Sequence, residues 1–370
     1  METYKTNAKG WSVFELAGRH RRALFMEREI LRQITGWFTV VPQWEIKHRM
    51  GYHAFAHAEH AQWLYERLEN LRGGNPEASI ESDFINDVKK NIDATNAEAF
   101  LAGIYQNLLP KLLAEYQETL AGADAAANAF DIRLIRRIIP EIQEQIRWAE
   151  ALLEEPEPTA AGPENDRFRL PDSIIFDERI GELPIMPHEE KMQLPYEKRI
   201  VEQFRVFFNE IYAASILSTV VHEAIDMQAP WPMVYWFSRH FWDEVRHSEF
   251  GARRLLELDA APDRCDQTLF RNARKMPFLH RVCYLTLVLE KHYMPRKKPR
   301  FDEYGSAGDL RSQLFADHDW SDEMNHVRNG KGWLEVLLED DARDVDDIKD
   351  ETMELLEQYA GSPVVSVSPF

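Results

Sequence analysis

The chain of 370 residues has few of the features that mark secreted, membrane or nucleic-acid-binding proteins. Its two cysteines, Cys265 and Cys283, are too few for a disulfide framework or a thiolate metal cluster. The net charge of −19 argues against a surface that binds nucleic acid or anionic lipid. No apolar run approaches the roughly 20 residues that span a bilayer, and the polar stretch Met1–Gly10 lacks the apolar core of a signal peptide. We therefore expect a cytoplasmic protein that binds neither nucleic acid nor membrane.

What the chain does have is helical periodicity and enough length for two domains. Apolar residues make up 44% of it, as in globular proteins. The first half predicts an N-terminal helical bundle, residues 1–155, with helices over 12–36, 43–72, 97–121 and 128–154. Seven prolines then interrupt residues 156–195. There we expect a linker that wraps the surface, with a short strand over Ser173–Phe176.

The second half predicts another helical domain over residues 196–340, so the expected fold class is all-α. The predicted helices cover residues 195–226, 233–258, 267–275, 277–294 and 308–339. Pro295 is expected to end the fourth of these, with Arg296–Arg300 as a basic loop behind it. Residues 341–370 form an acidic tail, in which we expect one more helix near 346–359.

The pattern Asp-Glu-x-x-His occurs twice in this second half, at Asp243–His247 and at Asp322–His326. A Glu and a His three residues apart lie on one helix face, so each motif can present a carboxylate and an imidazole to the same metal ion. Each motif also has a glutamate upstream: Glu210 lies 34 residues before Glu244 (244 − 210), and Glu290 lies 33 before Glu323 (323 − 290). A helix, a turn and an antiparallel helix use about that many residues.

The upstream glutamates stand in apolar surroundings. Glu290 follows the apolar run Val282–Leu289, where a carboxylate is costly unless a cation compensates it. A metal ion fits this position better than a salt bridge to an arginine. Glu210 has a similar setting, but Glu223 on the same predicted helix is a rival for its role or an additional ligand.

With these residues, the chain resembles the ferritin-like di-iron carboxylate superfamily. The last motif extends to Asp322-Glu-Met-Asn-His-Val-Arg-Asn-Gly-Lys-Gly-Trp333, which resembles an uncharacterised oxygenase-like branch with D-E-x-x-H-V-x-x-G-x-x-W in its last helix. The resemblance covers about residues 200–340. It implies a four-helix bundle in which two metal ions are held by Glu210, Glu244, His247, Glu290, Glu323 and His326.

The resemblance also implies roles for neighbours of these ligands. The aspartate before each ligand glutamate, Asp243 and Asp322, would accept a hydrogen bond from the ligand histidine of the opposite motif and orient it. Some di-iron N-oxygenases carry an extra histidine ligand one turn before their final Glu-x-x-His, where this chain has Asp319. His240 stands at that position before the first motif, and we leave open whether it is a ligand or a packed histidine.

Three histidines in the first half, His53, His57 and His60, share one helix face and could hold a metal. That half has no second Glu-x-x-His to join Glu45-x-x-His48, and Glu27, 32 residues before Glu59 (59 − 27), leads to Gln62 where a ligand histidine would be needed. We expect this half to be a metal-free structural pseudo-repeat. Whether the histidines bind anything stays open.

The functional expectation follows from the resemblance. It implies two iron ions, or a Mn/Fe pair, that activate O2 to hydroxylate, desaturate or N-oxygenate a small organic metabolite, with no catalytic residue beyond the metal ligands. The alternatives are an iron-handling ferroxidase without an organic substrate and a metal-free helical scaffold. No flavin or iron–sulfur signature is visible, so electrons would come from an external donor or from the substrate. A homodimer is left open.

Overall fold

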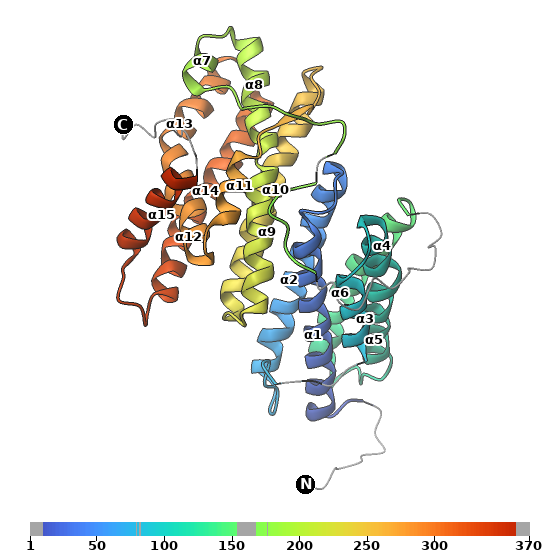
Figure 1. Ribbon diagram of the computed structural model, residues 1–370. Coiled ribbons are helices and arrows are strands. Elements are labelled where there is room, and N and C mark those ends of the chain that lie inside the picture. Colours follow the sequence, from blue (N-terminus) through green and yellow to red (C-terminus); the bar gives the residue numbers. More distant parts are fainter. Residues whose placement is uncertain (1–9, 79, 81–82, 154–167, 176, 360–370) are drawn as a thin grey trace. The chain divides into compact units, whose positions relative to one another are not determined.

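The computed structural model describes residues 10–78, 80, 83–153, 168–175 and 177–359, and these residues confirm the all-α fold class (Figure 1). The chain divides into two compact units. Unit 1 consists of residues 1–37 and 53–169, and unit 2 of residues 38–52 and 170–370. Each unit therefore takes part of the second helix, α2 (Trp44–Glu69). Residues 154–167, which include the start of the predicted linker, and residues 360–370 at the end of the predicted tail lie outside the described residues.

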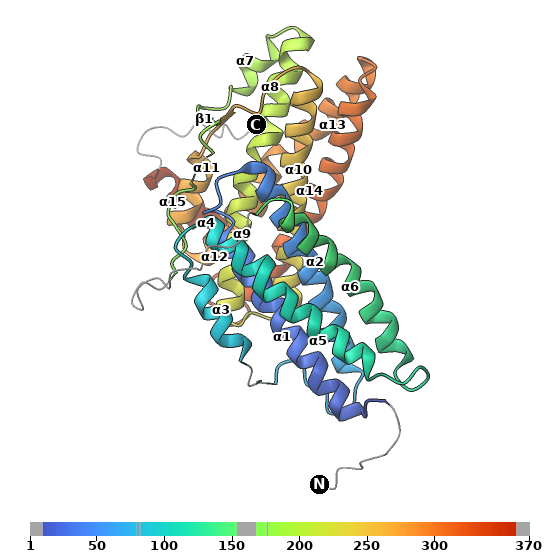
Figure 2. The same ribbon diagram turned by 90° about the vertical axis from the view of Figure 1, so that its right-hand side faces the viewer.

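Unit 1 is built from helices that pack along one another, with α1 (Val13–Trp37) against α5 (Leu109–Ala121) and α5 against α6 (Ala129–Glu150) (Figure 2). A helix that the periodicity did not predict, α3 (Phe84–Ile92), also packs on α1. The predicted helix over 97–121 is divided into α4 (Ala97–Ala102), a π-helical turn η1 (Gly103–Leu108) and α5.

Unit 2 contains long helical rods. The first is α8 (Tyr196–Asn209) continued by α9 (Ile211–Asp226), and the second is α10 (Trp231–Glu257), which packs against both. The third runs through α12 (Phe278–Cys283), the π-helix η2 (Tyr284–Glu290) and α13 (Lys291–Ser306). The fourth, α14 (Leu310–Leu337), packs against this third rod and against α10.

Smaller elements complete unit 2: α7 (His188–Met192), α11 (Thr268–Lys275) and α15 (Val345–Tyr359). Two short strands, β1 (Gly181–Glu182) and β2 (Arg264–Cys265), pair in parallel. The strand expected at 173–176 is wrong for residues 173–175, which adopt no strand, and Phe176 lies outside the described residues.

Local sequence explains where the rods begin. Pro230 precedes α10 and Pro232 occupies its first turn, where the missing amide hydrogen has no partner to lose. Asp309 caps α14 by accepting a hydrogen bond from the Ser312 amide at 3.0 Å. These boundaries set which residues of α10 and α14 face each other.

The expected helix end at Pro295 is wrong, because α13 continues through both Pro295 and Pro299. An interior proline costs a helix about 3 kcal/mol, so packing must hold the segment. Lys297 supplies part of that anchor, since its buried ammonium group bonds both carboxylate oxygens of Asp319 on α14 at 2.7 and 2.8 Å. The stretch Arg296–Arg300 is therefore helical and not a basic loop; within it Lys297 is buried, while Lys298 and Pro299 are exposed.

One stretch, Tyr196–Asp226, is long and apolar enough to cross a membrane by length and composition, which the sequence reading did not anticipate. However, 78% of its most apolar window is buried inside the protein, so its side chains already have protein partners. Ala214, Val220 and Val221 in α9 are fully buried.

Close helix contacts make Gly251→Ala a sharp test of this packing. A Cβ at Gly251 would lie 2.1 Å from the backbone nitrogen of Phe208, so α10 and α8 must separate to accept it. We expect a loss of about 1–3 kcal/mol in the free energy of unfolding, the usual cost of overpacking.

Gly332→Ala on α14 is the matched control, because a Cβ there meets nothing within 4 Å. It should be neutral or stabilising by up to about 1 kcal/mol, as alanine restricts the unfolded chain. Denaturant unfolding of both variants measures the difference; equal stabilities would contradict the close packing of α10 on α8.

Candidate metal centre

The six predicted ligands come from four places in unit 2 and meet in its interior. Glu210 lies at the break between α8 and α9, and Glu290 is the last residue of η2. The two motifs lie on α10 and α14. Their ligand atoms form three overlapping groups that could each hold a metal ion, with all atoms of a group within 4.8 Å: His240, Glu244, Glu290 and His326; Glu210, His247 and Asp319; Glu244, His247 and Glu323.

Two of these groups share one residue, Glu244. Glu244 belongs to the group around His326 and also to a group with His247. Its Oε1 atom lies 3.4 Å from His326 Nδ1 and 3.7 Å from His247 Nδ1. Glu244 thus lies between two imidazoles that come from different helices.

Unpartnered polar atoms point into the same space. Within the described part of the chain, each of the six ligands has a buried polar atom that makes no well-formed hydrogen bond: Glu210 Oε2, Glu244 Oε1, His247 Nδ1, Glu290 Oε2, Glu323 Oε2 and His326 Nδ1. Buried polar atoms are normally satisfied, and unsatisfied ones call for an explanation such as an ion. These residues therefore fit a metal centre, although the identity of the metal does not follow from them.

The outer nitrogens of the two histidines have partners from the opposite motif. His247 Nε2 donates to Asp322 at 3.3 Å, and His326 Nε2 donates to Asp243 at 3.3 Å. Donation from Nε2 leaves Nδ1 with its lone pair toward the centre, as a metal ligand requires. Arg246 contacts both aspartates, Asp243 at 2.5 Å and Asp322 at 3.2 Å.

His240 and Asp319 occupy equivalent places, each four residues before the ligand glutamate of its motif. His240 Nε2 lies 2.7 Å from Glu290 and joins the group of His326. Asp319 joins the group of Glu210 and His247. Asp319 was not among the predicted ligands, although its spacing, one helical turn before Glu323, was the signal that could have found it.

Glu223, the rival of Glu210, lies in none of these groups among the described residues. Its carboxylate bonds Arg281 at 2.7 Å and Arg274 at 3.3 Å. The structure therefore assembles Glu210, and not Glu223, with the two motifs.

Lys297 is the residue that sequence reading missed most completely. Its Nζ atom bonds Asp319 and lies 3.1 Å from Glu323 Oε1. Burial alone would lower the pKa of this lysine, but Asp319 and Glu323 raise it, so it stays charged. The expected loop after Pro295 removed it from consideration, because only a continuous helix turns residue 297 toward α14.

The cluster contains more carboxylate groups than positively charged side chains. Protons bound to some of the carboxylates and histidines reduce the excess of negative charge. Burial raises the pKa of Glu323 to about 8, with repulsion from Glu290, Asp319 and Glu244 adding to it against the attraction of Lys297. Burial likewise raises the pKa of Glu210 to about 6. For His247 and His326, burial alone would lower the pKa, but the surrounding carboxylates raise it well above its ordinary value. The cluster thus attracts positive charge.

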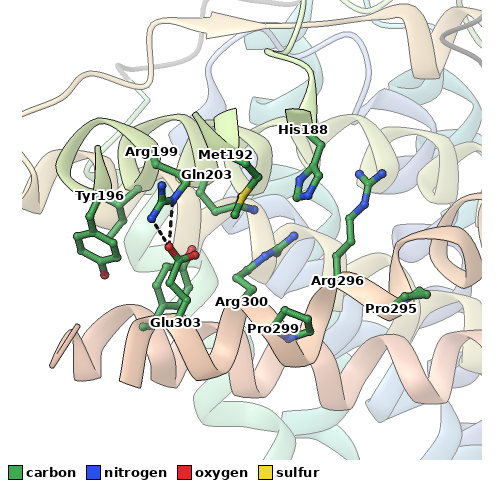
Figure 3. A pocket seen from close by; sticks show the side chains of 12 residues that line it. His188, Met192, Tyr196, Arg199, Gln203, Pro295, Arg296, Pro299, Arg300 and Glu303 are labelled. Atoms are coloured by element: carbon green, nitrogen blue, oxygen red, sulfur yellow. Dashed lines mark hydrogen bonds and ion pairs between the residues drawn. The ribbon is translucent and has the colours of Figure 1, made fainter. Parts of the chain in front are cut away.

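A pocket of about 250 Å³ lies between α7, α8 and α13 (Figure 3). Figure 3 shows Arg296 and Arg300 beside it, while Arg199 is paired with Glu303 at 2.9 Å. Arg300 also reaches the centre, since its Nη1 atom lies 3.9 Å from Asp319 Oδ2. One side chain thus connects the basic pocket to the carboxylate cluster.

Asp322→Asn tests the outer contact of His247. The amide keeps the shape but removes the negative charge behind the imidazole, so we expect a loss of about 10- to 100-fold in affinity for divalent metal. Asp317→Asn, at an exposed position on the same helix, is the control and should bind like the parent. Metal titration of both variants measures the two affinities. Equal affinities would show that Asp322 does not contribute to metal binding through His247.

Stability of the metal-free protein should depend on pH through Glu323. Its folded-state pKa of about 8 lies above the ordinary 4.5, so the folded state holds the proton more tightly and its stability falls as pH rises from about 4.5 to about 8. The raised pKa values of His247 and His326 act in the same direction.

We therefore expect the free energy of unfolding in a chelator to be lower at the upper end of this window than near its middle. Glu323→Gln should reduce the slope, whereas Glu335→Gln, at an exposed position on α14, should leave it unchanged. Denaturant titrations across the window measure this, and a slope unaffected by Glu323→Gln would contradict the assignment.

No protein-family model, curated protein or solved structure matches the chain. What is known of the centre is therefore its chemistry: buried histidines and carboxylates on helices that could hold metal ions.

Proposed function

We propose that unit 2 is a ferritin-like four-helix bundle that holds two iron ions and acts as an O2-dependent oxidoreductase on a small organic metabolite. The observation that carries the proposal is the set of unpartnered carboxylate and imidazole atoms that converge from four helical rods, with Glu244 shared between two groups. A Glu from each of two rods and Glu-x-x-His from each of the others is the ligand pattern of that superfamily.

The charge of the cluster supports two divalent ions. Five carboxylates, from Glu210, Glu244, Glu290, Glu323 and Asp319, face one ammonium group, from Lys297. When all five are deprotonated, Lys297 leaves four negative charges and Arg300, 3.9 Å from Asp319, offsets part of them; two divalent cations would balance the excess. The aspartates behind the histidines do not add to this excess, because Arg239 and Arg246 pair with them.

The donor types favour iron or manganese. Carboxylate oxygens outnumber imidazole nitrogens, whereas zinc sites use fewer ligands and favour nitrogen and sulfur. We propose an Fe/Fe centre, with a Mn/Fe centre as the variation. When bound, two Fe(II) ions supply electrons to O2 and the oxidising power that acts on the substrate.

The residues of this chain would prepare that chemistry. Asp243 and Asp322 hold the protons of His326 and His247 on Nε2. Lys297 keeps Asp319 and Glu323 in place while the metal positions are empty or filled. Phe204, Phe207 and Phe241 are fully buried on α8 and α10 and help exclude water from this part of the unit.

The basic pocket favours an organic substrate over iron handling. Arg296 and Arg300 would repel Fe(II) arriving by this route and attract a small anion such as a carboxylate or phosphate ester. We propose that the anionic group of the substrate binds these arginines, one side chain away from Asp319. An external electron donor remains part of the proposal unless the substrate itself provides the electrons.

Anaerobic loading with Fe(II) followed by O2 tests the function. A panel of small carboxylates, phosphate esters and amines is incubated with the loaded protein, and mass spectrometry searches for products that gain an oxygen atom or lose two hydrogens. We expect turnover of an anionic compound, abolished by Glu290→Ala and weakened mainly in KM by Arg296→Gln. Arg311→Gln, an arginine on α14 outside the pocket, is the control.

Other outcomes identify the alternatives. Oxidation of many Fe(II) equivalents with retained ferric iron and no organic product would identify an iron-handling protein. Failure of unit 2 to bind iron would identify a metal-free scaffold, and iron binding that Glu290→Ala does not affect would place the metal at other residues. Either outcome would end the proposal.

A further inference from the structure

Unit 1 contains a second buried cluster, formed by Glu27 on α1 with His57 and His60 on α2. All three side chains are fully buried. One ligand atom from each lies within 4.8 Å of the others. The sequence offered several glutamates as partners for these histidines, and the packing of the helices places Glu27 of α1 against them.

The two imidazoles have the same orientation. Each turns Nδ1 toward the carboxylate of Glu27, with His60 Nδ1 at 3.2 Å from Glu27 Oε1 and His57 Nδ1 close to Oε2. Each turns Nε2 outward to an oxygen on α6: His57 to Gln145 Oε1 at 3.0 Å, and His60 to Glu141 Oε2 at 3.2 Å. This is the arrangement in which an outer acceptor fixes the tautomer of a metal-binding histidine.

The tautomer with the proton on Nε2 places the Nδ1 lone pairs of both histidines against the carboxylate of Glu27, an unfavourable contact that a cation would relieve. If the Nε2 protons are donated outward, both Nδ1 lone pairs face a carboxylate that also bears lone pairs. His60 Nδ1 makes no well-formed hydrogen bond to any described residue, although it is fully buried. Tyr116 donates its hydroxyl to Glu27 at 2.6 Å, which supplies one hydrogen bond but no charge. With this tautomer, a cation between the two Nδ1 atoms and the carboxylate, either a metal ion or a proton, relieves the contact between lone pairs.

We propose that Glu27, His57 and His60 bind one divalent first-row transition metal ion, through the carboxylate and the two Nδ1 atoms. Two imidazoles and one carboxylate suit zinc, iron(II) or cobalt(II) better than calcium or magnesium, which prefer oxygen ligands alone. The site ties α1 to α2 directly and to α6 through Gln145 and Glu141. It does not depend on the centre in unit 2.

The alternative occupant is a proton, which would turn a histidine into an imidazolium ion paired with Glu27. The two occupants predict different results when metal is added. If a proton occupies the cluster, added metal changes nothing; if the cluster binds metal, the folded protein becomes more stable and shows ligand-field absorption.

Cobalt(II) is the probe, because its absorption reports bound nitrogen and oxygen ligands. The full chain is first changed at Glu244→Ala, His247→Ala and His326→Ala, so that none of the three groups in unit 2 keeps three members. We expect this protein to retain one cobalt ion per chain after dialysis, as a two-histidine, one-carboxylate site would. Its unfolding midpoint should rise when cobalt is added, since a ligand of the folded state stabilises it.

His60→Gln in this background should abolish the bound ion, its absorption and the rise in the midpoint. His53→Gln is the matched control: His53 is equally buried on the same helix, but it bonds Tyr105 and lies outside the cluster. It should keep all three signals. Circular dichroism verifies folding of each variant.

A folded background protein that holds no cobalt, or His60→Gln that binds as His53→Gln does, would overturn the proposal in favour of a proton. Should the background fail to fold, the two histidine variants are compared in the parent. There the His60 variant must lose one ion relative to the His53 variant for the proposal to stand.

Discussion

The burial of five carboxylates in one place is the constraint on which unit 2 depends. A buried charge costs several kcal/mol unless a partner compensates it, and Lys297 compensates only part of this cluster. A proton on Glu323, and one on Glu210 at lower pH, relieve a further part when metal is absent. The helices pack closely around the cluster, because Gly251 lets α10 approach the backbone of Phe208 and Gly330 lets α14 approach Thr286. The packing thus maintains a site that divalent cations would stabilise.

Departures from regular helix deliver the two single glutamates to this site. Glu210 stands at the break between α8 and α9, and Glu290 ends the π-helix η2. Each residue of an α-helix turns by about 100°, so a local change of winding redirects a side chain without moving the rod that carries it. Single π-turns in helices are frequent at functional sites for this reason. Apolar residues before Glu290 remain packed while the carboxylate turns to the centre.

The sequence predicted what local spacing determines. The doubled Asp-Glu-x-x-His and the matched distances to Glu210 and Glu290 predicted which side chains the structure brings together, and periodicity predicted most helices. Spacing could not predict Lys297, because Pro295 and Pro299 oppose a helix locally and tertiary packing, including the ion pair with Asp319, holds the helix together. It could not join Glu27 to His57 and His60 either, since the choice among several glutamates depends on how α1 and α2 pack.

The carboxylate–histidine clusters of units 1 and 2 orient their histidines in the same way but differ in their number of carboxylates. In both, two histidines turn Nδ1 inward to a carboxylate and Nε2 outward to an acceptor: His247 and His326 to Asp322 and Asp243 in unit 2, and His57 and His60 to Gln145 and Glu141 in unit 1. The excess of carboxylates in unit 2 would suit the two divalent ions that we propose there, and Glu27 with the outer Glu141 would suit the one ion that we propose in unit 1. Because imidazole is neutral when it binds a metal, the carboxylates limit the positive charge that each cluster can hold, whatever reaction unit 2 performs.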